Sequence, residues 1–526
     1  MENTTYDVIV AGGGPAGLSA ALTLGRSRRR VLVLDDDTPR NRFAAHMHTV
    51  LGHDGIPPHE LRTRGLEEVA RYGVEVRHAR AASVADAGRT VEVRTEDGER
   101  LSARHLVAAT GARDLLPDLP GLQQHWGRHV LHCPYCHGWE VREQRLGLLL
   151  LLEVGLHQAE LLTQWTPRLT VFTGALGPLA PAVQQRLRAA AVEVVDTPVS
   201  EVLGDDEELR GVRLDDGTEV ALDALFVGAP MEPHDGFLAD LGLERSATPV
   251  GEFVQVDQMG RTSHPRVWGI GNLVNPMANV PMSSAAGVLT GSAVNGALVG
   301  EDLDDAQQRA ATEFWDGHYA RHEQVWSGRV NAATASVVST LEPGEVLELG
   351  CGEGGDAVWL AERGWRVTAV DIAEAAVERG AAAAQARGVG DRVRWLARDL
   401  ARWQPTADDL PDLDLVTASF FHAPFEFPRA EVLQRAAARL RPGGHLLLVS
   451  HVMESQDDVP PWAWREGHEH PHMPREDVAG LGFDDDARWR VVLDEVRERE
   501  AAAPDGEHAG HTAHVRDGVL LLQRVE

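Results

Sequence analysis

The 526-residue sequence has only three cysteines, Cys133, Cys136 and Cys351, which excludes a fold held together by several disulfides. Two of them form a C-x-x-C pair, and no second pair exists to complete a four-cysteine zinc site. We therefore expect no bound metal. The pair Cys133 and Cys136 is interpreted as a redox couple, and Cys351 as a packing residue.

Long hydrophobic runs, a leader sequence and an excess of positive charge are also missing. No apolar stretch reaches the roughly 18 residues that span a bilayer. The chain begins MENTTYDVIV, without the basic and apolar regions of a signal peptide. Its formal net charge of -30 repels polyanions and anionic membranes. We therefore expect a cytoplasmic protein that binds neither nucleic acid nor membranes.

The chain is too long for one hydrophobic core, because cores rarely exceed roughly 250 to 300 residues before a chain divides into domains. A strand–helix–strand pattern covers residues 6–35, and a second one begins at residue 345 and reaches residue 371. Such units build parallel sheets covered by helices. The sequence thus predicts an α/β protein of several domains with two separate nucleotide folds.

The first pattern carries a dinucleotide-binding motif. Gly12, Gly14 and Gly17 form G-x-G-x-x-G directly after the first strand and at the start of a helix. The first glycine permits the tight turn, the second lets a pyrophosphate approach the backbone, and the third lets the helix pack closely. Asp35 ends the next strand, where a carboxylate accepts hydrogen bonds from a ribose. These four residues are candidates for nucleotide binding.

A later segment indicates which nucleotide binds. VWGIGNLVNP, residues 267–276, resembles the terminal motif of the thioredoxin reductase branch of the pyridine nucleotide-disulfide oxidoreductases, in which a G-D pair contacts FAD. This chain has Gly271 and Asn272 at that pair. Asn272 still offers hydrogen bonds to a hydroxyl but lacks the negative charge. The resemblance implies that FAD is the cofactor of the N-terminal half.

The same resemblance implies a two-domain flavoprotein disulfide reductase fold. Residues 1–120 and 234–300 are expected to form a discontinuous FAD domain, and residues 121–233 an inserted NAD(P)-type domain. The family also implies a homodimer formed through this half. A polar, acidic stretch at residues 301–313 is expected to be the linker to the next domain, at residues 314–526.

The segment CPYCHGWE carries the C-x-x-C pair at the family's position for a redox-active disulfide. One thiolate of such a pair attacks a partner disulfide and the other resolves the mixed disulfide. By resemblance, Cys133 exchanges with substrate and Cys136 faces the flavin. His137 stands where related enzymes carry an acid, and its imidazole is the candidate proton carrier.

The glycine motif that binds NADPH in the family is not found in the inserted domain. After the strand LGLLLLL the sequence reads EVGLHQA, and GALGPLAP replaces the basic cluster that binds a 2′-phosphate. A nicotinamide site of the usual kind is therefore not expected. C-x-x-C-H with a degraded NADPH segment resembles the dithiol oxidases of epidithiodiketopiperazine and dithiolopyrrolone biosynthesis. Those enzymes oxidise small dithiols and pass the electrons through FAD to oxygen.

Histidines cluster nearby in AAHMHTVLGHDG, a segment that is also similar to the family. His46, His48 and His53 are expected to be loop or packing residues. Histidines near the C-terminus, in the segments 468–472 and 508–514, are expected to be solvated rather than metal ligands.

The second pattern contains ELGCGEG, which resembles the first motif of class I methyltransferases that use S-adenosylmethionine (SAM). Its glycines keep the backbone open for the methionine portion of SAM. An acid at the end of the next strand is placed for the ribose, and one in LARDLARW matches the adenine-contacting acid. The SAM candidates are Glu348, Gly350, Gly352, Gly354, Asp371 and Asp399.

Upstream of this motif, FWDGHYARHEQVWSGRVN resembles the N-terminal cap of thiopurine and tellurite methyltransferases. Trp315, Tyr319 and Trp326 are expected either to form a lid over SAM or to pack in the core. His422 follows the fourth strand of this domain, where acceptor-side residues fall, and is a candidate base.

Together these features predict a bifunctional enzyme. The flavin half oxidises or reduces a small thiol or disulfide compound, and the methyltransferase methylates a thiol or similar soft nucleophile. Two alternatives remain at this level. One is an NADPH-dependent thioredoxin reductase fused to a detoxifying methyltransferase, and the other is a redox sensor that gates the methyltransferase.

Overall fold

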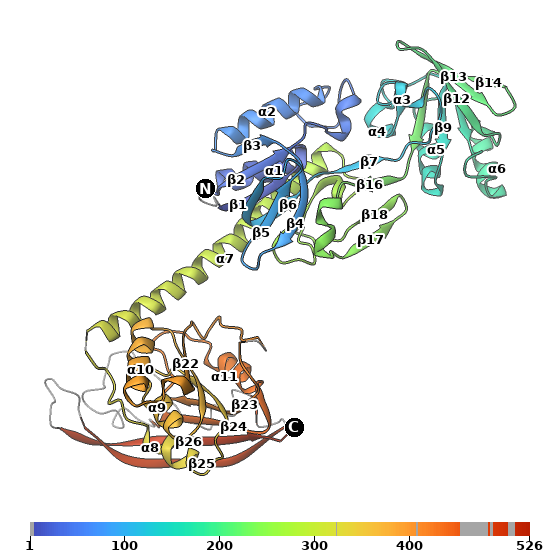
Figure 1. The fold of residues 1–526 in the computed structure, drawn as a ribbon. Coiled ribbons are helices and arrows are strands. Elements are labelled where there is room, and N and C mark those ends of the chain that lie inside the picture. The colour runs from blue at the N-terminus through green and yellow to red at the C-terminus, as the bar shows by residue number, and fades with distance from the viewer. Residues whose placement is uncertain are drawn as a thin grey trace. The chain divides into compact units, whose positions relative to one another are not determined.

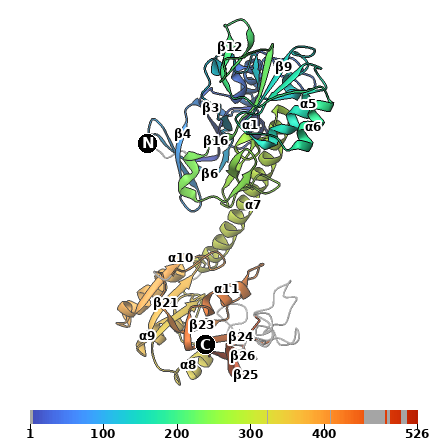
Figure 2. The ribbon, with the colours of Figure 1, turned by 90° about the vertical axis from the view of Figure 1, so that its right-hand side faces the viewer.

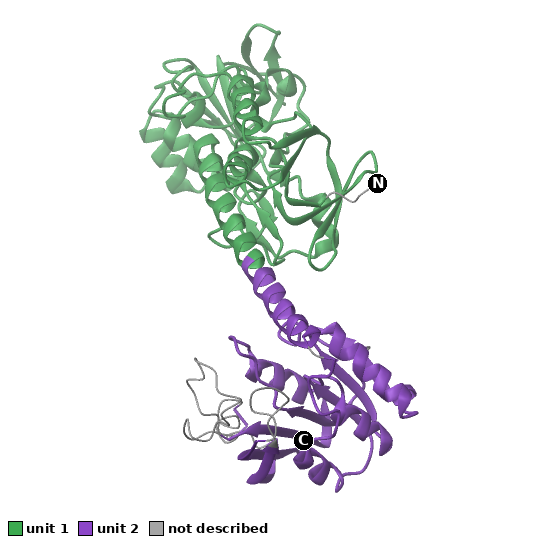
Figure 3. Ribbon diagram, turned by 90° about the vertical axis from the view of Figure 1, so that its left-hand side faces the viewer, with its two compact units in different colours: residues 1–302 green, residues 303–526 purple. Residues whose placement is uncertain are grey.

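The computed structural model describes residues 5–321, 323–406, 409–452, 482–483, 488–502 and 511–525. The chain divides into two compact units, residues 1–302 and 303–526 (Figure 3). The division lies inside the long helix α7 (Val280–Ala320), so the predicted linker at residues 301–313 is helical. Among the described residues, no helix is both long and apolar enough to cross a membrane.

The first sheet of the N-terminal unit has the strand order β3-β2-β1-β6-β5-β4. Its central strands are parallel and read as continuous apolar runs, since both faces are buried. β19 pairs with β6, so a strand from much later in the sequence completes this sheet (Figure 1). The elements are β1 (Thr5–Ala11), α1 (Pro15–Arg26), β2 (Val31–Asp35), η1 (Arg40–Phe43), α2 (Pro58–Ala70), β3 (Glu75–His78), β4 (Ala81–Asp86), β5 (Val91–Thr95), β6 (Arg100–Ala108), β19 (Val267–Gly269) and η4 (Gly271–Leu273).

A second, parallel sheet of order β11-β10-β9-β15-β8 packs helices α5 and α6 against its apolar core. An antiparallel three-stranded sheet, β12-β13-β14, adjoins it through a second apolar cluster. The elements are α3 (Leu122–His125), β8 (Val130–Leu131), α4 (Pro134–His137), β9 (Leu146–Leu150), η2 (Glu153–Gly155), α5 (Leu156–Leu162), β10 (Leu169–Phe172), α6 (Pro181–Ala189), β11 (Glu193–Val195), β12 (Val199–Gly204), β13 (Leu209–Leu214), β14 (Glu219–Ala221) and β15 (Ala224–Gly228).

Two short antiparallel strands join the chain entering and leaving this second sheet. β7 (Ala112–Asp114) pairs with β16 (Met231–Pro233), so both crossings lie side by side. The N-terminal unit is therefore one nucleotide fold with a second inserted into it. The remaining elements of the unit are η3 (Gly236–Leu241), β17 (Arg245–Thr248) and β18 (Gly251–Val254).

The C-terminal unit is built on one sheet of order β22-β21-β20-β23-β24-β26-β25. The first five strands are parallel and the last two antiparallel. Helices α8 to α10 cover one face and α11 the other (Figure 2). The elements are α8 (Ala332–Val338), β20 (Glu345–Leu349), α9 (Gly355–Glu362), β21 (Arg366–Asp371), α10 (Glu374–Ala386), η5 (Gly390–Arg392), β22 (Val393–Ala397), β23 (Leu413–Ser419), α11 (Arg429–Ala437), β24 (Leu440–His451), β25 (Trp489–Ala502) and β26 (Thr512–Arg524).

Candidate active sites

The predicted dinucleotide turn joins β1 to α1. A Cβ on Gly17 would lie 1.9 Å from the carbonyl oxygen of Gly12, and one on Gly12, where φ is +110°, would lie 2.4 Å from that of Ala109. Any larger residue at either position would clash with backbone. A Cβ on Gly14, by contrast, would meet no atom within 4 Å. The turn is thus tightly packed at Gly12 and Gly17, whereas the space beside Gly14 is open, as a bound pyrophosphate requires.

Asp35, at the end of β2, is buried beside this turn with 7% of its surface exposed. Its carboxylate accepts a hydrogen bond from the backbone N–H of Gly13 at 3.1 Å and forms an ion pair with Arg62 of α2. This position next to the turn suits the predicted ribose contact. Sequence analysis did not identify Arg62, because its contact with Asp35 joins two elements and leaves no local pattern.

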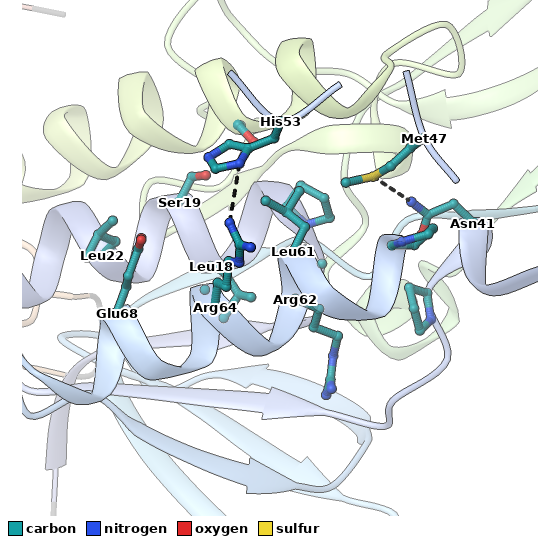
Figure 4. A pocket seen from close by; sticks show the side chains of 16 residues that line it. Leu18, Ser19, Leu22, Asn41, Met47, His53, Leu61, Arg62, Arg64 and Glu68 are labelled. Atoms are coloured by element: carbon teal, nitrogen blue, oxygen red, sulfur yellow. Dashed lines mark hydrogen bonds between the residues drawn. The ribbon is translucent and has the colours of Figure 1, made fainter. Parts of the chain in front are cut away.

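A cavity lies beside the turn, between α1, α2 and the segment 39–53 (Figure 4). His53 Nδ1 and Arg64 lie 3.5 Å apart on its wall, and the amide of Asn41 donates to the sulfur of Met47 at 3.8 Å. Arg62 and Arg64 bring positive charge to a strongly acidic protein, and the N-terminus of α1 adds N–H donors. These groups fit the phosphates of a dinucleotide such as FAD.

The predicted second FAD contact lies at η4. Gly271 has φ +67°, and its α-carbon lies close to α1, where a Cβ would be 3.1 Å from that of Ala16. The side-chain nitrogen of Asn272 donates to the carbonyls of Asn275 and Ala278, each at 3.0 Å. That nitrogen therefore stabilises the loop that follows η4. The contact between Asn272 and the flavin stays a prediction that involves its oxygen or its backbone.

The cysteine pair lies at the start of α4, which immediately follows β8. The sulfurs of Cys133 and Cys136 are 2.8 Å apart and both side chains are partly buried. The thiol of Cys136 and the N–H groups of Cys136 and Tyr135 stabilise the Cys133 thiolate, so the pKa of Cys133 falls to about 7. The same interaction, together with burial, raises the pKa of Cys136. Cys133 is therefore the thiolate of the pair at neutral pH.

Two residues from segments outside the inserted domain, Arg40 and Asp114, also influence the cysteine pair. Arg40 of η1 binds Asp114 of β7 through two hydrogen bonds of 2.8 and 2.5 Å. Asp114 is buried and lies 3.8 Å from Nδ1 of His132, the residue before Cys133. Burial, and next the charge of Arg40, lower the pKa of His132 to about 4. Arg40 also lowers the pKa of Cys133. No sequence motif marks Arg40 or Asp114, because only the tertiary fold brings them to the cysteines.

His137 ends α4 directly after Cys136. Burial lowers its pKa, against the opposing charge of Glu140. Its neutral imidazole can accept a proton at neutral pH, as the predicted role requires. Glu140 in turn lies 3.3 Å from Nε2 of His48, one of the loop histidines. The segment 46–53 therefore contributes a histidine to the surroundings of the cysteine pair, which the sequence interpretation of His48 as a loop residue did not anticipate.

The inserted domain has acidic residues at the positions that correspond to a dinucleotide site. β9 is followed by η2, where Glu153 places a carboxylate at the approach to α5. At the end of β10, Thr173 donates to Asp196 at 2.6 Å, where NADPH-dependent relatives are expected to hold a 2′-phosphate with basic residues. Two acids at these positions repel phosphate. Glu153 and Asp196 therefore place carboxylates where a nicotinamide dinucleotide site of the usual kind has open backbone and basic residues.

The first methyltransferase motif forms the turn between β20 and α9. Gly354 has φ +77°, and a Cβ there would lie 2.2 Å from the ring of Trp395. A Cβ on Gly350, at φ +66°, would lie 2.7 Å from the ring of Phe421. The N–H of Gly352 donates to Asp371 at 2.8 Å. The turn is thus fixed by glycines and held next to the acid predicted to bind the ribose of SAM.

The carboxylates buried around this turn include Glu348, Asp356 and Asp371. Burial raises the pKa of each of these three. Oε2 of Glu348 is buried and has no hydrogen-bond partner among the residues that the structure describes. Buried acids of this kind require a cationic or donor group. The sulfonium and ammonium of SAM provide such groups, so Glu348 fits the cofactor. Asp356 and Asp371 already accept hydrogen bonds from residues of the domain. Asp356 was not identified from the sequence.

The cap segment lies against the same turn. The indole N–H of Trp326 donates to the hydroxyl of Tyr319 at 3.0 Å, and a Cβ on Gly352 would lie 3.1 Å from the Trp326 ring. Tyr319 is buried, whereas half of Trp326 is exposed. Glu353 accepts from the N–H of Trp326 and pairs with Arg379. Tyr319 therefore packs in the core and Trp326 lies against the turn, while a lid over SAM stays a prediction.

The other predicted residues lie around this site. Asp399 follows β22, and its carboxylate accepts from the N–H of Ala401 at 2.9 Å. His422 is exposed, just beyond the end of β23. Among the described residues, no group of three or more histidines, cysteines and acids is placed to hold a metal. His468, His470, His472 and His508 lie outside the described residues.

Each of the two units matches a known protein family. Residues 6–288 match the family model described as pyridine nucleotide-disulphide oxidoreductase, and residues 346–444 match that of a methyltransferase domain. Because the first match covers more than half of the sequence, the chain belongs to the pyridine nucleotide-disulphide oxidoreductase family.

Particular relatives match over the N-terminal unit. Thioredoxin reductase sirT of Leptosphaeria maculans is 34% identical over 57% of this chain and 96% of its own length. Thioredoxin reductase tcpT of Claviceps purpurea is 30% identical over 56% and 95%. The crystal structure of HlmI is 41% identical, with a TM-score of 0.56 over 58% of this chain and 96% of that one. The N-terminal unit is thus an FAD-dependent, thioredoxin reductase-like oxidoreductase, and it is fused to a SAM-dependent methyltransferase domain.

Proposed function

We propose that the flavin half is a dithiol oxidase for a small molecule. Two observations together carry this proposal. The first is a C-x-x-C pair in which the pKa of Cys133 is about 7. The second is an inserted domain with Glu153 and Asp196 at the positions where a nicotinamide dinucleotide needs open backbone and basic residues. Electrons therefore enter from the thiol side. FAD, when bound, supplies the two-electron transfer from the cysteine pair to molecular oxygen, which becomes hydrogen peroxide.

The exchange chemistry follows from the two cysteine environments. A substrate thiolate attacks Cys133 of the Cys133–Cys136 disulfide, and Cys136 leaves as a thiol after taking a proton. The second substrate thiol then loses its proton to solvent and attacks the mixed disulfide, and Cys133 departs as a thiolate. A leaving thiol of low pKa departs faster, which suits Cys133 to this position. His137, whose pKa is lowered by burial, accepts the substrate proton and delivers it to Cys136.

We propose that the C-terminal half methylates a small thiol or similar soft nucleophile. The turn with Gly350, Gly352 and Gly354 holds SAM, Asp371 binds its ribose, Asp399 its adenine, and Glu348 its cationic portion. Methyl transfer to a thiol depends chiefly on positioning and on exclusion of water. The fusion supports a shared pathway for the two activities. A homodimer formed through the flavin half and a cytoplasmic location complete the proposal.

The roles of the cysteines are tested with two serine variants of the full chain. Cys136→Ser is expected to keep FAD bound and to abolish turnover of a dithiol such as dithiothreitol. When this variant is given a linear disulfide such as 2-hydroxyethyl disulfide, the Cys133 thiolate is expected to attack it and keep one half as a mixed disulfide, while the other half leaves as a thiol. Cys133→Ser is expected to abolish turnover without such an adduct. Cys351→Ser is the matched control, because that thiol is buried in the other unit. Mass spectrometry locates the adduct, and dithiol turnover retained in Cys136→Ser would contradict the proposal.

A further inference from the structure

His451 is the last residue of β24, and its ring is oriented by two strands that follow it in the sequence. Nδ1 of His451 lies 3.1 Å from a carboxylate oxygen of Asp517 on β26, its cross-strand neighbour. Asp517 is 3% exposed and also accepts a hydrogen bond of 2.5 Å from Arg499 of β25. Although burial opposes ionisation, the bonds from His451 and Arg499 hold the pKa of Asp517 below its ordinary value. A carboxylate on Nδ1 fixes the tautomer whose Nε2 accepts a proton.

The same ring is held at the edge of the sheet that carries the methyltransferase motif. Phe420, immediately after β23, stacks on the His451 ring with centroids 4.2 Å apart. Its neighbour Phe421 lies against Gly350, where a Cβ would be 2.7 Å from the Phe421 ring. One dipeptide therefore bridges the SAM turn and His451. Because β20, β23 and β24 are parallel, their carboxyl ends meet at this edge, where α/β folds bind ligands.

Two further observations distinguish this histidine from an ordinary cross-strand pair. Phe420 has φ +52°, a conformation that non-glycine residues rarely adopt and that occurs preferentially at functional sites. The His451 side chain is 40% exposed, whereas its partner Asp517 is buried. A buried, charged acid that orients an accessible imidazole is the arrangement of a general base.

We propose that His451 is the general base of the methyltransferase and that Asp517 and Arg499 are its positioning residues. This inference rests on the proposed methylation of a soft nucleophile. Nε2 of His451 removes the proton from the acceptor S–H as a bond forms between the acceptor sulfur and the methyl carbon and the bond from that carbon to the SAM sulfonium breaks. The products are a thioether and S-adenosylhomocysteine, and His451 passes the proton to solvent. This assignment replaces His422 as the candidate base.

The test compares two acceptors in the full-length protein. An alkyl thiol, with a pKa near about 8.5 as in free cysteine, needs a base at pH 7, whereas an aromatic thiol that is already ionised does not. We expect His451→Gln to lower kcat roughly 100-fold for the alkyl thiol, within the usual range for loss of a general base, and to leave the aromatic thiol nearly unaffected. His445→Gln, six residues earlier on β24, is the matched control and should affect neither.

Two readouts do not depend on turnover. SAM affinity, measured by calorimetry, should be the same in His451→Gln as in the unchanged protein, which shows that the fold is intact. ¹⁵N NMR of the imidazole should show His451 protonated on Nδ1, and Asp517→Asn should change that tautomer. Equal losses for the two thiols, or no loss for either, would overturn the assignment of His451. If the unchanged protein binds SAM but methylates neither thiol, the proposed function itself fails.

Discussion

Arg40 and Asp114 form a two-bond ion pair beside the cysteines of the C-x-x-C pair, although 74 residues separate them in the sequence. The charge of Arg40 contributes to the low pKa of Cys133, which is about 7. We expect Arg40→Gln to raise that pKa by about 1 unit, the lower end of the effect of a nearby opposite charge. The measurement is the pH dependence of iodoacetamide alkylation of the reduced protein, with Cys136 replaced by serine in both forms so that only Cys133 reports.

Arg42 provides the matched control for this experiment. It lies two residues from Arg40, but its guanidinium donates to backbone carbonyls of Thr38 and Pro39 and covers the ring of Phe43. Arg42→Gln should therefore leave the alkylation profile unchanged. If both variants raised the pKa of Cys133 by the same amount, general surface charge, rather than the pair of Arg40 with Asp114, would set the reactivity of Cys133.

Two glycines of the dinucleotide turn should respond differently to the same substitution. A Cβ on Gly14 meets open space, so Gly14→Ala should leave the apoprotein as stable as before and weaken FAD binding at least about tenfold, or about 1.4 kcal/mol. A Cβ on Gly17 collides with the carbonyl of Gly12, so Gly17→Ala should destabilise the fold itself by about 1 to 3 kcal/mol.

Denaturation of the FAD-free variants and titration with FAD separate these two effects. If Gly14→Ala bound FAD as tightly as the unchanged protein, the cofactor phosphates would not lie over this turn.

If Asp371 binds the ribose of SAM, its substitution should weaken SAM binding and leave the flavin half unaffected. Asp371→Asn removes a charge that would accept hydrogen bonds from SAM, each worth about 1.5 to 3 kcal/mol for a charged acceptor. We expect SAM affinity to fall at least about tenfold while dithiol turnover stays unchanged. Asp391→Asn, an exposed acid of the same unit, is the control. Calorimetry with SAM provides the measurement, and an unchanged affinity in Asp371→Asn would exclude the ribose contact.

The sequence predicted those parts of the fold that follow local rules. Strand, glycine turn, helix and acid occur in order at Gly12 to Asp35 and again at Gly350 to Asp371, because each nucleotide turn is built from consecutive residues. The fold class and both domain families are confirmed by the family models. The C-x-x-C spacing likewise places Cys136 in the first turn of α4, three residues after Cys133 at the N-cap of that helix.

The surroundings of these motifs were beyond sequence analysis for a physical reason. Arg40 and Asp114 reach Cys133 only after β7 pairs with β16, and Asp517 reaches His451 only through the pairing of β24 with β26. Such partners lie tens of residues apart and follow no period. The sequence indicates His422 because it follows a strand in the segment where acceptor-side residues fall. No local pattern indicates His451, because the orientation of its imidazole depends on an acid 66 residues away.

The origin of the electrons is the central claim, and it can be measured directly. The flavin absorbance near about 450 nm is followed anaerobically while one sample receives dithiothreitol and another NADPH, since the redox state of the flavin reports electron entry. We predict that the dithiol bleaches the flavin, that air restores the colour, and that NADPH has no effect. Rapid bleaching by NADPH would contradict the account and identify the N-terminal unit as a reductase.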